Sequence, residues 1–213
     1  MTGAVAQMTI EDFVESFVPE DSVLAAARAR SEEVGIVPIT PAAGAALRLL
    51  AAAAQAKAVV EVGTGTGLSG LWLLRGMRPD GVLTSIDAEA EHQRLARASF
   101  TAEGVPTSRA RLINGRALDV LPRLADGAYD MVFCSADRRE YPDYLSQVVR
   151  LLRPHGILIF DGASRGADST ARDAESAAIR RLYEQVIEDG RLAPALLPVG
   201  TGLLAAAVVA EEA

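Results

Sequence analysis

A segment that alternates glycine with threonine carries the most chemical information in this sequence. An apolar run from Val59 leads into Gly63-Thr64-Gly65-Thr66-Gly67. Glycine permits a tight turn and lets a ligand lie against the backbone, although such a turn can also serve only close packing. Asp87 follows the next apolar run, where its carboxylate can accept hydrogen bonds from both hydroxyls of a ribose, each worth about 1.5–3 kcal/mol. Together these residues predict a site for a ligand that contains a nucleoside.

The acidic residue in front of the glycines restricts which nucleoside fits. Glu61 stands where the pyrophosphate of a dinucleotide would approach, and its negative charge is unfavourable for phosphate. S-adenosylmethionine fits better, because it has a ribose, an adenine, an ammonium group and a sulfonium but no phosphate. A short-chain oxidoreductase would need a Tyr-x-x-x-Lys pair, and the only lysine, Lys57, precedes the glycine loop. We therefore expect S-adenosylmethionine and not a nicotinamide dinucleotide.

The elements that must position these residues alternate along the middle of the chain. Apolar runs suited to buried parallel strands lie at Ala58–Val62, Val82–Ile86, Ala110–Ile113, Met131–Cys134 and Ile157–Phe160. Helical stretches between them lie at Leu68–Gly76, Ala88–Glu103, Ala117–Leu124 and Tyr141–Leu152. This alternation predicts a doubly wound, Rossmann-like α/β sheet with right-handed crossovers.

The C-terminal part departs from this alternation. A helix expected over Ala171–Asp189 is followed by two strand-like runs, Arg191–Val199 and Leu203–Val209, joined by a glycine-rich turn. Runs this close in sequence must pair antiparallel. We therefore expect a seven-stranded sheet, mostly parallel, that ends in an antiparallel hairpin.

The N-terminal part is expected to be helical. Two helices are predicted between Thr9 and Val34, with Thr9 and Asp12 as an N-cap pair and a break at 19–22. A third helix runs from Pro41 toward residue 55. We expect a single domain over residues 1–213, with residues 1–36 as an N-terminal helical cap.

The composition restricts partners and location. The 213 residues include 28 acidic and 21 basic side chains, for a formal net charge of -7. This charge disfavours binding to phosphate backbones and to anionic lipid. Cys134 is the only cysteine, so an internal disulfide and a thiolate zinc cluster are excluded. The sequence shows neither a signal-peptide pattern nor an apolar run of about 18 residues. We expect a cytoplasmic protein with no nucleic-acid or membrane partner.

Several separated stretches resemble one family, the S-adenosylmethionine-dependent O-methyltransferases related to catechol and caffeoyl-CoA O-methyltransferases, especially its small bacterial members. The matching stretches keep the family's order over nearly the whole chain; they are Ile39–Gly44, Glu61–Ser69, Leu121-Pro122, Tyr129–Phe133, Tyr141–Tyr144, Leu151–Ile157 and Leu197–Leu203. The resemblance implies a class I methyltransferase fold, O-methylation of a small acceptor such as a phenol, and a homodimer.

The resemblance also implies cofactor-binding residues, position by position. Those implied for the methionine part are Val37, Glu61, Gly63, Thr64 and Ser69, and Gly65 belongs to the same loop. Asp87 would hold the ribose, and Ala117 and Asp137 would lie against the adenosine. Without the family, the Ser69 hydroxyl could equally well satisfy only a local backbone donor.

Departures from the family pattern fall where relatives bind a divalent metal. Relatives end one strand with Asp-Ala-Asp-Lys, where this chain has Ser135-Ala136-Asp137-Arg138, and the next with Asp-Asn, where it has Asp161-Gly162. Asp161 is thus the only retained family ligand. Because magnesium is held through carboxylates, a single one would make a weak site. We therefore predict no metal site and regard a divalent metal as a doubtful cofactor.

Arg138 and Asp161 are the candidate catalytic residues. Arg138 stands in place of the family's lysine and stays protonated, so it cannot accept a proton but can stabilise an anionic oxygen. The acceptor's proton must then leave through another group, or the acceptor must arrive already acidic, since a plain phenol is mostly un-ionised at neutral pH. Two hypotheses remain open: a methyltransferase, and a non-catalytic relative that only binds S-adenosylmethionine.

Overall fold

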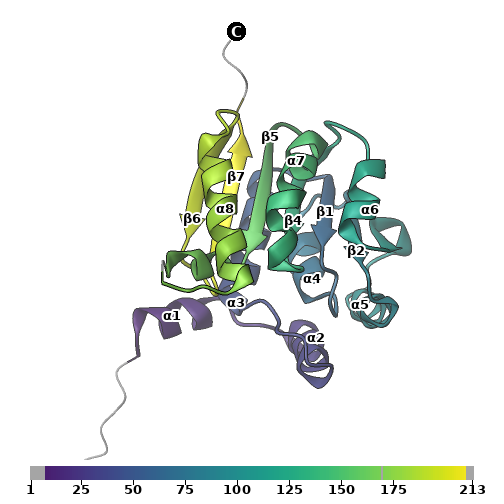
Figure 1. The fold of residues 1–213 in the computed structure, drawn as a ribbon. Coiled ribbons are helices and arrows are strands. Elements are labelled where there is room, and N and C mark those ends of the chain that lie inside the picture. The colour runs from purple at the N-terminus through teal and green to yellow at the C-terminus, as the bar shows by residue number, and fades with distance from the viewer. Residues whose placement is uncertain (1–7, 169, 210–213) are drawn as a thin grey trace, which may run out of the picture.

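A seven-stranded sheet forms the centre of the molecule, in a computed structural model that describes residues 8–168 and 170–209 (Figure 1). The strand order is β3-β2-β1-β4-β5-β7-β6. The strands from β1 to β5 pair in parallel, and β7 pairs antiparallel with both β5 and β6. Their bounds are β1 (Ala58–Val62), β2 (Val82–Asp87), β3 (Ala110–Asn114), β4 (Tyr129–Cys134), β5 (Leu152–Asp161), β6 (Leu192–Leu197) and β7 (Leu203–Val208). The predicted fold class is confirmed.

Helices cover both faces of this sheet, because side chains alternate between the faces along each buried strand. One face packs against α3 (Pro41–Ala53), α4 (Leu68–Gly76) and α5 (Ala90–Ala102), and the other against α6 (Ala117–Val120), α7 (Tyr141–Leu151) and α8 (Ala174–Glu188). Val59 and Val60 show the alternation: both are fully buried, one in each core. The apolar runs of the sequence therefore end up buried on both sides.

The N-terminal helices lie below the sheet in Figure 1, in two separate places. They are α1 (Ile10–Phe17) and α2 (Ser22–Glu33), and the capping box predicted for Thr9 and Asp12 is present. Helix α1 buries no residue of its own, whereas α2 buries Leu24, Ala27 and Ser31. The predicted helices are confirmed; residues 1–7 of the expected cap lie outside the described residues.

Three element ends differ from the sequence-based expectation by three residues or more. The helix expected over Ala117–Leu124 ends at Val120 and continues as the short 3-10 turn Leu121–Arg123, because Pro122 lacks the N–H that an α-helix needs there. Strand β5 begins at Leu152, five residues early, and its pairing with β4 is irregular where His155 takes a positive φ of 65°. Helix α8 begins at Ala174 and not at Ala171, because the Asp173 side chain caps it.

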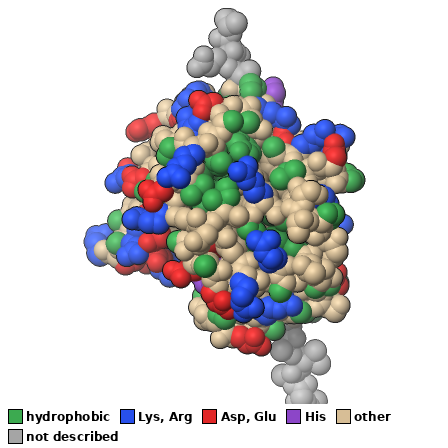
Figure 2. Space-filling model, turned by 90° about the vertical axis from the view of Figure 1, so that its right-hand side faces the viewer, with side chains coloured by type: hydrophobic (Ala, Val, Ile, Leu, Met, Phe, Trp, Pro, Cys, Tyr) green, Lys and Arg blue, Asp and Glu red, His purple; other side chains and the backbone are tan. Residues whose placement is uncertain are grey.

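Two observations bear on the predicted absence of membrane and nucleic-acid partners: the length of the apolar helices and the side chains on one face. In residues 8–168 and 170–209, no helix is both long and apolar enough to cross a membrane. The side that carries β2, α5 and α6 shows basic and acidic side chains together with a small hydrophobic area (Figure 2).

Candidate active site

A cavity of about 390 Å³ opens at the carboxyl ends of the parallel strands. Its wall combines the glycine loop after β1, the end of β2, the segments after β3 and β4, and the linker between α2 and α3. The predicted cofactor residues in this wall are Val37, Gly63, Thr64, Gly65, Ser69, Asp87, Ala117 and Asp137. The structure thus brings together residues that are spread over a hundred positions of sequence.

The glycine loop follows a path that requires glycine. Gly63, Gly65 and Gly67 have positive φ angles of 95°, 51° and 86°, and Gly67 is the N-cap of α4. A Cβ at position 63 would lie 2.7 Å from the carbonyl carbon of Ser135, so the loop after β1 and the end of β4 approach without space for a side chain. The glycine loop therefore lies close against the end of β4.

Asp87 is tied into the wall of the cavity by the backbone. Its Oδ2 accepts a hydrogen bond from the Gly65 N–H at 3.0 Å, and its Oδ1 accepts one from the Glu89 N–H at 2.9 Å. His92 Nδ1 lies 3.2 Å and 3.3 Å from the two carboxylate oxygens. The carboxylate is therefore fixed in orientation at the end of β2, with capacity left for a ligand hydroxyl.

Helix α2 supports the glycine loop from outside. Thr66 Oγ1 lies 2.6 Å from the Ser31 hydroxyl and donates to the carbonyl of Ala27, while the Ser99 hydroxyl donates to the Thr66 carbonyl. Ser31 and Thr66 are both buried. The N-terminal segment is therefore part of the architecture of the site.

Glu61 lies behind the cavity wall and is fully buried. Its carboxylate accepts hydrogen bonds from Ser69 Oγ at 2.6 Å and from Ser85 Oγ at 2.5 Å. Burial raises the pKa of Glu61 to about 7, although both serine hydrogen bonds act in the opposite direction. Ser69 thus connects Glu61 to the cavity, which Ser69 lines, and a direct contact of Glu61 with the cofactor stays a prediction.

The free energy of unfolding is expected to fall by roughly 3 kcal/mol as pH rises from about 4.5 to about 7, because Glu61 must ionise in the folded core. Its pKa is raised from the ordinary value of 4.5, so the folded state binds more protons than the unfolded state within this window. Urea unfolding of the wild type and of Glu61→Gln at several pH values measures this effect. Glutamine does not titrate, so the difference between the two proteins should change with pH; a constant difference contradicts the prediction.

The part of the cavity wall that follows β4 contains residues that sequence reasoning missed. Glu140 and Tyr144 line it, and the Tyr144 hydroxyl donates to Glu140 Oε2 at 2.5 Å. His92 was also missed, although its position five residues after Asp87, in the first turns of α5, is a signal that could have been used. Asp137 lies here too, and the Arg139 guanidinium holds the pKa of its carboxyl below the usual value.

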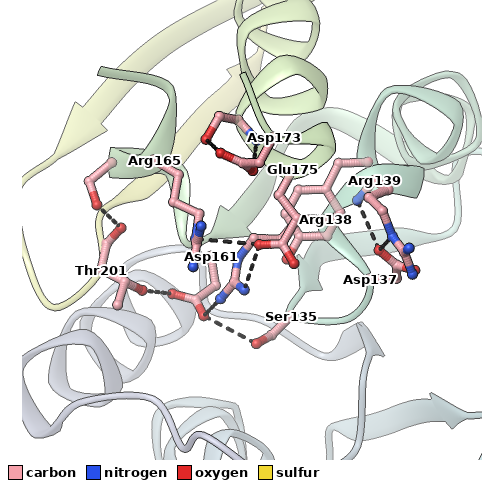
Figure 3. A network of polar contacts seen from close by, with 12 residues as sticks. Ser135, Asp137, Arg138, Arg139, Asp161, Arg165, Asp173, Glu175 and Thr201 are labelled. Atoms are coloured by element: carbon pink, nitrogen blue, oxygen red, sulfur yellow. Dashed lines mark hydrogen bonds and ion pairs between the residues drawn. The ribbon is translucent and has the colours of Figure 1, made fainter. Parts of the chain in front are cut away.

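Arg138 and Asp161 meet beside the cavity, at the ends of β4 and β5 (Figure 3). Asp161 is 5% exposed and accepts hydrogen bonds from Thr201 Oγ1 at 3.0 Å and from Ser135 Oγ at 3.2 Å. Arg138 Nη2 lies 3.8 Å from Asp161 Oδ2. The two candidate catalytic residues therefore form a half-buried ion pair.

The donor set around Asp161 does not fit a divalent cation. Ser135 offers a neutral hydroxyl and Gly162 offers no side chain, while Arg138 brings a positive charge close to the one carboxylate. A Cβ built at position 162 would lie 2.7 Å from Cζ and 2.8 Å from Nη2 of Arg138. The guanidinium occupies the volume that a ligating side chain at position 162 would need. Within the described residues, no group of three or more His, Cys, Asp and Glu side chains could hold a metal ion.

Comparison with known proteins identifies the family. A model of the O-methyltransferase family matches residues 18–208. The chain belongs to this O-methyltransferase family. The Mycobacterium tuberculosis protein named "Probable O-methyltransferase Rv1220c" is 53% identical over 195 residues, which are 90% of this chain and 87% of that protein. The family and enzyme class predicted from the sequence are confirmed.

Solved structures share the fold of this O-methyltransferase. The O-methyltransferase TomG from Streptomyces achromogenes, which is involved in tomaymycin synthesis and was solved in complex with S-adenosylmethionine, is 30% identical with a TM-score of 0.84. The match covers 93% of this chain and 94% of TomG. A protein from Corynebacterium glutamicum is 32% identical with a TM-score of 0.87, over 94% of this chain and 95% of that one. The cavity at the sheet edge therefore lies in the fold that holds the cofactor in TomG.

Proposed function

We propose that this O-methyltransferase uses S-adenosylmethionine to methylate a hydroxyl oxygen of a small, phenol-like acceptor without a divalent metal. The observation that carries the proposal is the cavity at the strand ends, with Asp87 in its wall and the ion pair of Arg138 and Asp161 beside it. TomG binds S-adenosylmethionine in the same fold, which supports the cofactor.

The residues of the cavity suit each part of the cofactor. Asp87 would accept hydrogen bonds from the ribose hydroxyls, and Ala117, Asp137 and Glu140 would lie against the adenosine. Thr64 and Ser69 would face the methionine part, where the buried Glu61 carboxylate favours a cationic group. When bound, S-adenosylmethionine supplies a methyl group on a positively charged sulfur. The protein's main contribution is then to align the acceptor oxygen with that methyl group.

Alignment alone can account for a large part of the rate. Holding two reactants in the productive geometry can lower a barrier by roughly 7–11 kcal/mol. Relatives that use a metal gain in addition the acidification of the acceptor. Here the Arg138 guanidinium would provide the positive charge near the acceptor oxygen, because no metal-compatible donor set surrounds Asp161 within the part of the chain that the structure describes.

Metal-free protein is expected to bind S-adenosylmethionine with the same affinity as protein in excess Mg²⁺, within about twofold, because a single carboxylate holds Mg²⁺ weakly. Isothermal titration of S-adenosylmethionine in EDTA and in Mg²⁺ measures this. Methyl transfer to a panel of phenols under both conditions tests the reaction itself. A tenfold gain with Mg²⁺ that disappears in Asp161→Asn would overturn the metal-independent proposal.

The same titrations test the remaining alternatives. NADH binding without S-adenosylmethionine binding would refute the cofactor. Binding of S-adenosylmethionine with no methyl transfer to any acceptor would favour the non-catalytic alternative. The matching family and relatives carry the names of methyltransferases, which is no support for that alternative.

A further inference from the structure

Arg138 differs from other arginines of the chain in what its guanidinium contacts. Arg28, Arg75 and Arg139 each donate two hydrogen bonds to a carboxylate. Arg138 instead lies 3.8 Å from Asp161 Oδ2 and 3.7 Å from Glu175 Oε2, both beyond hydrogen-bond distance. Its Nε is buried and has no hydrogen-bond partner among the described residues. An arginine has five N–H donors, so most of the donor capacity of Arg138 is unused.

The two carboxylates beside Arg138 also lie near other groups. Asp161 accepts from Thr201 and Ser135, and Glu175 Oε2 lies 3.3 Å from Arg165 Nε. Figure 3 shows the resulting row of alternating charges, in the order Asp161, Arg138, Glu175 and Arg165. The row is neutral as a whole. Asp161 already accepts two hydrogen bonds from neutral hydroxyls, whereas neither Glu175 Oε2 nor Arg138 Nε has a hydrogen-bond partner among the described residues. The guanidinium is therefore available to an additional anionic atom.

The guanidinium lies next to the cavity proposed for the cofactor. Ser135 lines that cavity and also donates to Asp161, so one side chain connects the cavity to the ion pair. Gly162 has no side chain, so the guanidinium can lie directly over it; a Cβ at this position would collide with Arg138. Arg138 itself lies outside the cavity lining, so an acceptor that meets its unused donors must extend from the cavity past Ser135 toward Asp161.

We propose, on the basis of the function proposed above, that Arg138 binds the reacting oxygen of the acceptor as an oxyanion. The preferred acceptor is then a hydroxyl acidic enough to ionise near neutral pH, such as a phenol with an electron-withdrawing substituent. An oxyanion accepts two N–H groups of a guanidinium fork, and such charge-assisted hydrogen bonds are stronger than those to a neutral hydroxyl.

The chemistry balances without a basic residue. The acceptor releases its proton to solvent as it binds, and Arg138 stays protonated throughout. A lone pair of the oxyanion then forms the bond to the methyl carbon. The bond between that carbon and sulfur breaks, and its electron pair goes to sulfur, so the products are a methyl ether and a neutral thioether. Of the two routes by which the acceptor can lose its proton, transfer to another protein group or ionisation of an already acidic acceptor, the proposal selects the second.

The test uses 4-nitrophenol, whose phenolate form absorbs visible light, with protein saturated with S-adenosylhomocysteine. A pH titration of the absorbance gives the pKa of the bound phenol. We expect the wild type to lower this pKa by at least one unit, which is tenfold more phenolate at a given acidic pH. Arg138→Met should abolish the shift, and Arg138→Lys should keep part of it, because the charge remains without the planar fork.

Three controls separate the possible failures. Arg181→Met removes an exposed arginine of α8 that pairs with Asp143, and it should leave the shift unchanged. Binding of 4-nitroanisole, which cannot ionise, should not depend on Arg138. An unchanged affinity of Arg138→Met for S-adenosylhomocysteine shows that the cofactor cavity is intact.

Two outcomes distinguish failure of this proposal from failure of the proposed function. If the wild type binds S-adenosylhomocysteine but does not bind or ionise 4-nitrophenol, the oxyanion proposal is wrong and the proposed function stands. If S-adenosylhomocysteine does not bind, the proposed function fails first.

Discussion

Asp87→Ala is expected to weaken binding of S-adenosylmethionine by roughly 100-fold, the largest loss of cofactor affinity from removing one side chain. Each charge-assisted hydrogen bond to a ribose hydroxyl is worth about 1.5–3 kcal/mol, and 1.4 kcal/mol is a factor of ten in affinity. The carboxylate is already oriented by the N–H groups of Gly65 and Glu89. The wild-type protein therefore loses little entropy in ordering this group when the ligand binds.

Isothermal titration with S-adenosylmethionine and S-adenosylhomocysteine measures this loss. Both ligands carry the same ribose, so the fold-change should be the same for both. Asp87→Asn is the matched variant, because the amide keeps one acceptor oxygen but not the charge, and we expect an intermediate loss. His92→Gln tests the neighbour that contacts the carboxylate. Wild-type affinity in Asp87→Ala would show that the ribose is held elsewhere.

The central βα unit shows how much of the fold local sequence can determine. The bounds predicted for Ala58–Val62 and Leu68–Gly76 are those of β1 and α4. Both elements are buried almost throughout, so an uninterrupted apolar pattern marks their length, and glycines mark the turn between them. The start of β5 was not predictable in this way. Its first residue, Leu152, pairs with Tyr129 across an irregular stretch, and only the neighbouring strand defines that pairing.

The site was predictable to the extent that its residues follow strand ends. Asp87 and the glycine loop come directly after buried strands, and parallel strands bring their carboxyl ends to one edge. Glu140 and Tyr144 were missed because they lie in and just before a helix, where nothing in the local pattern indicates a cavity. Glu61 was predicted to contact the ligand; in the structure it is hydrogen-bonded to Ser69, which lines the cavity, and its own contact with the cofactor stays a prediction.

The structure relates the departures at Arg138 and Gly162 to each other, which the sequence alone does not. In the sequence they are two separate departures from a family pattern, at the ends of two different strands. In the structure the guanidinium lies over Gly162, so a side chain at position 162 would displace Arg138 from its present position. The two departures are therefore linked, because the glycine at position 162 leaves the space that the arginine at position 138 occupies.

Gly63→Ala is expected to lower the free energy of unfolding by about 3 kcal/mol or more, with cofactor binding reduced below detection. Gly63 has a φ of 95°, and a left-handed backbone costs a residue with a side chain roughly 1–2 kcal/mol. The new methyl group would also collide with the Ser135 carbonyl group, 2.7 Å from its carbon and closer still to its oxygen, and forcing extra volume into a packed site costs about 1–3 kcal/mol more. To relieve the clash, the loop must move away from β4, which carries Thr64 and Gly65 away from the cavity wall.

Gly104→Ala separates the two costs of that substitution. Gly104 has a φ of 76°, but a Cβ there would meet nothing within 4 Å, and the residue does not line the cavity. This variant should lose only the backbone contribution of roughly 1–2 kcal/mol and should bind S-adenosylmethionine like the wild type. Urea unfolding and isothermal titration of both variants give the comparison. Equal losses of stability in the two proteins would mean that the contact with Ser135 relaxes freely, and that the loop does not depend on its close approach to β4.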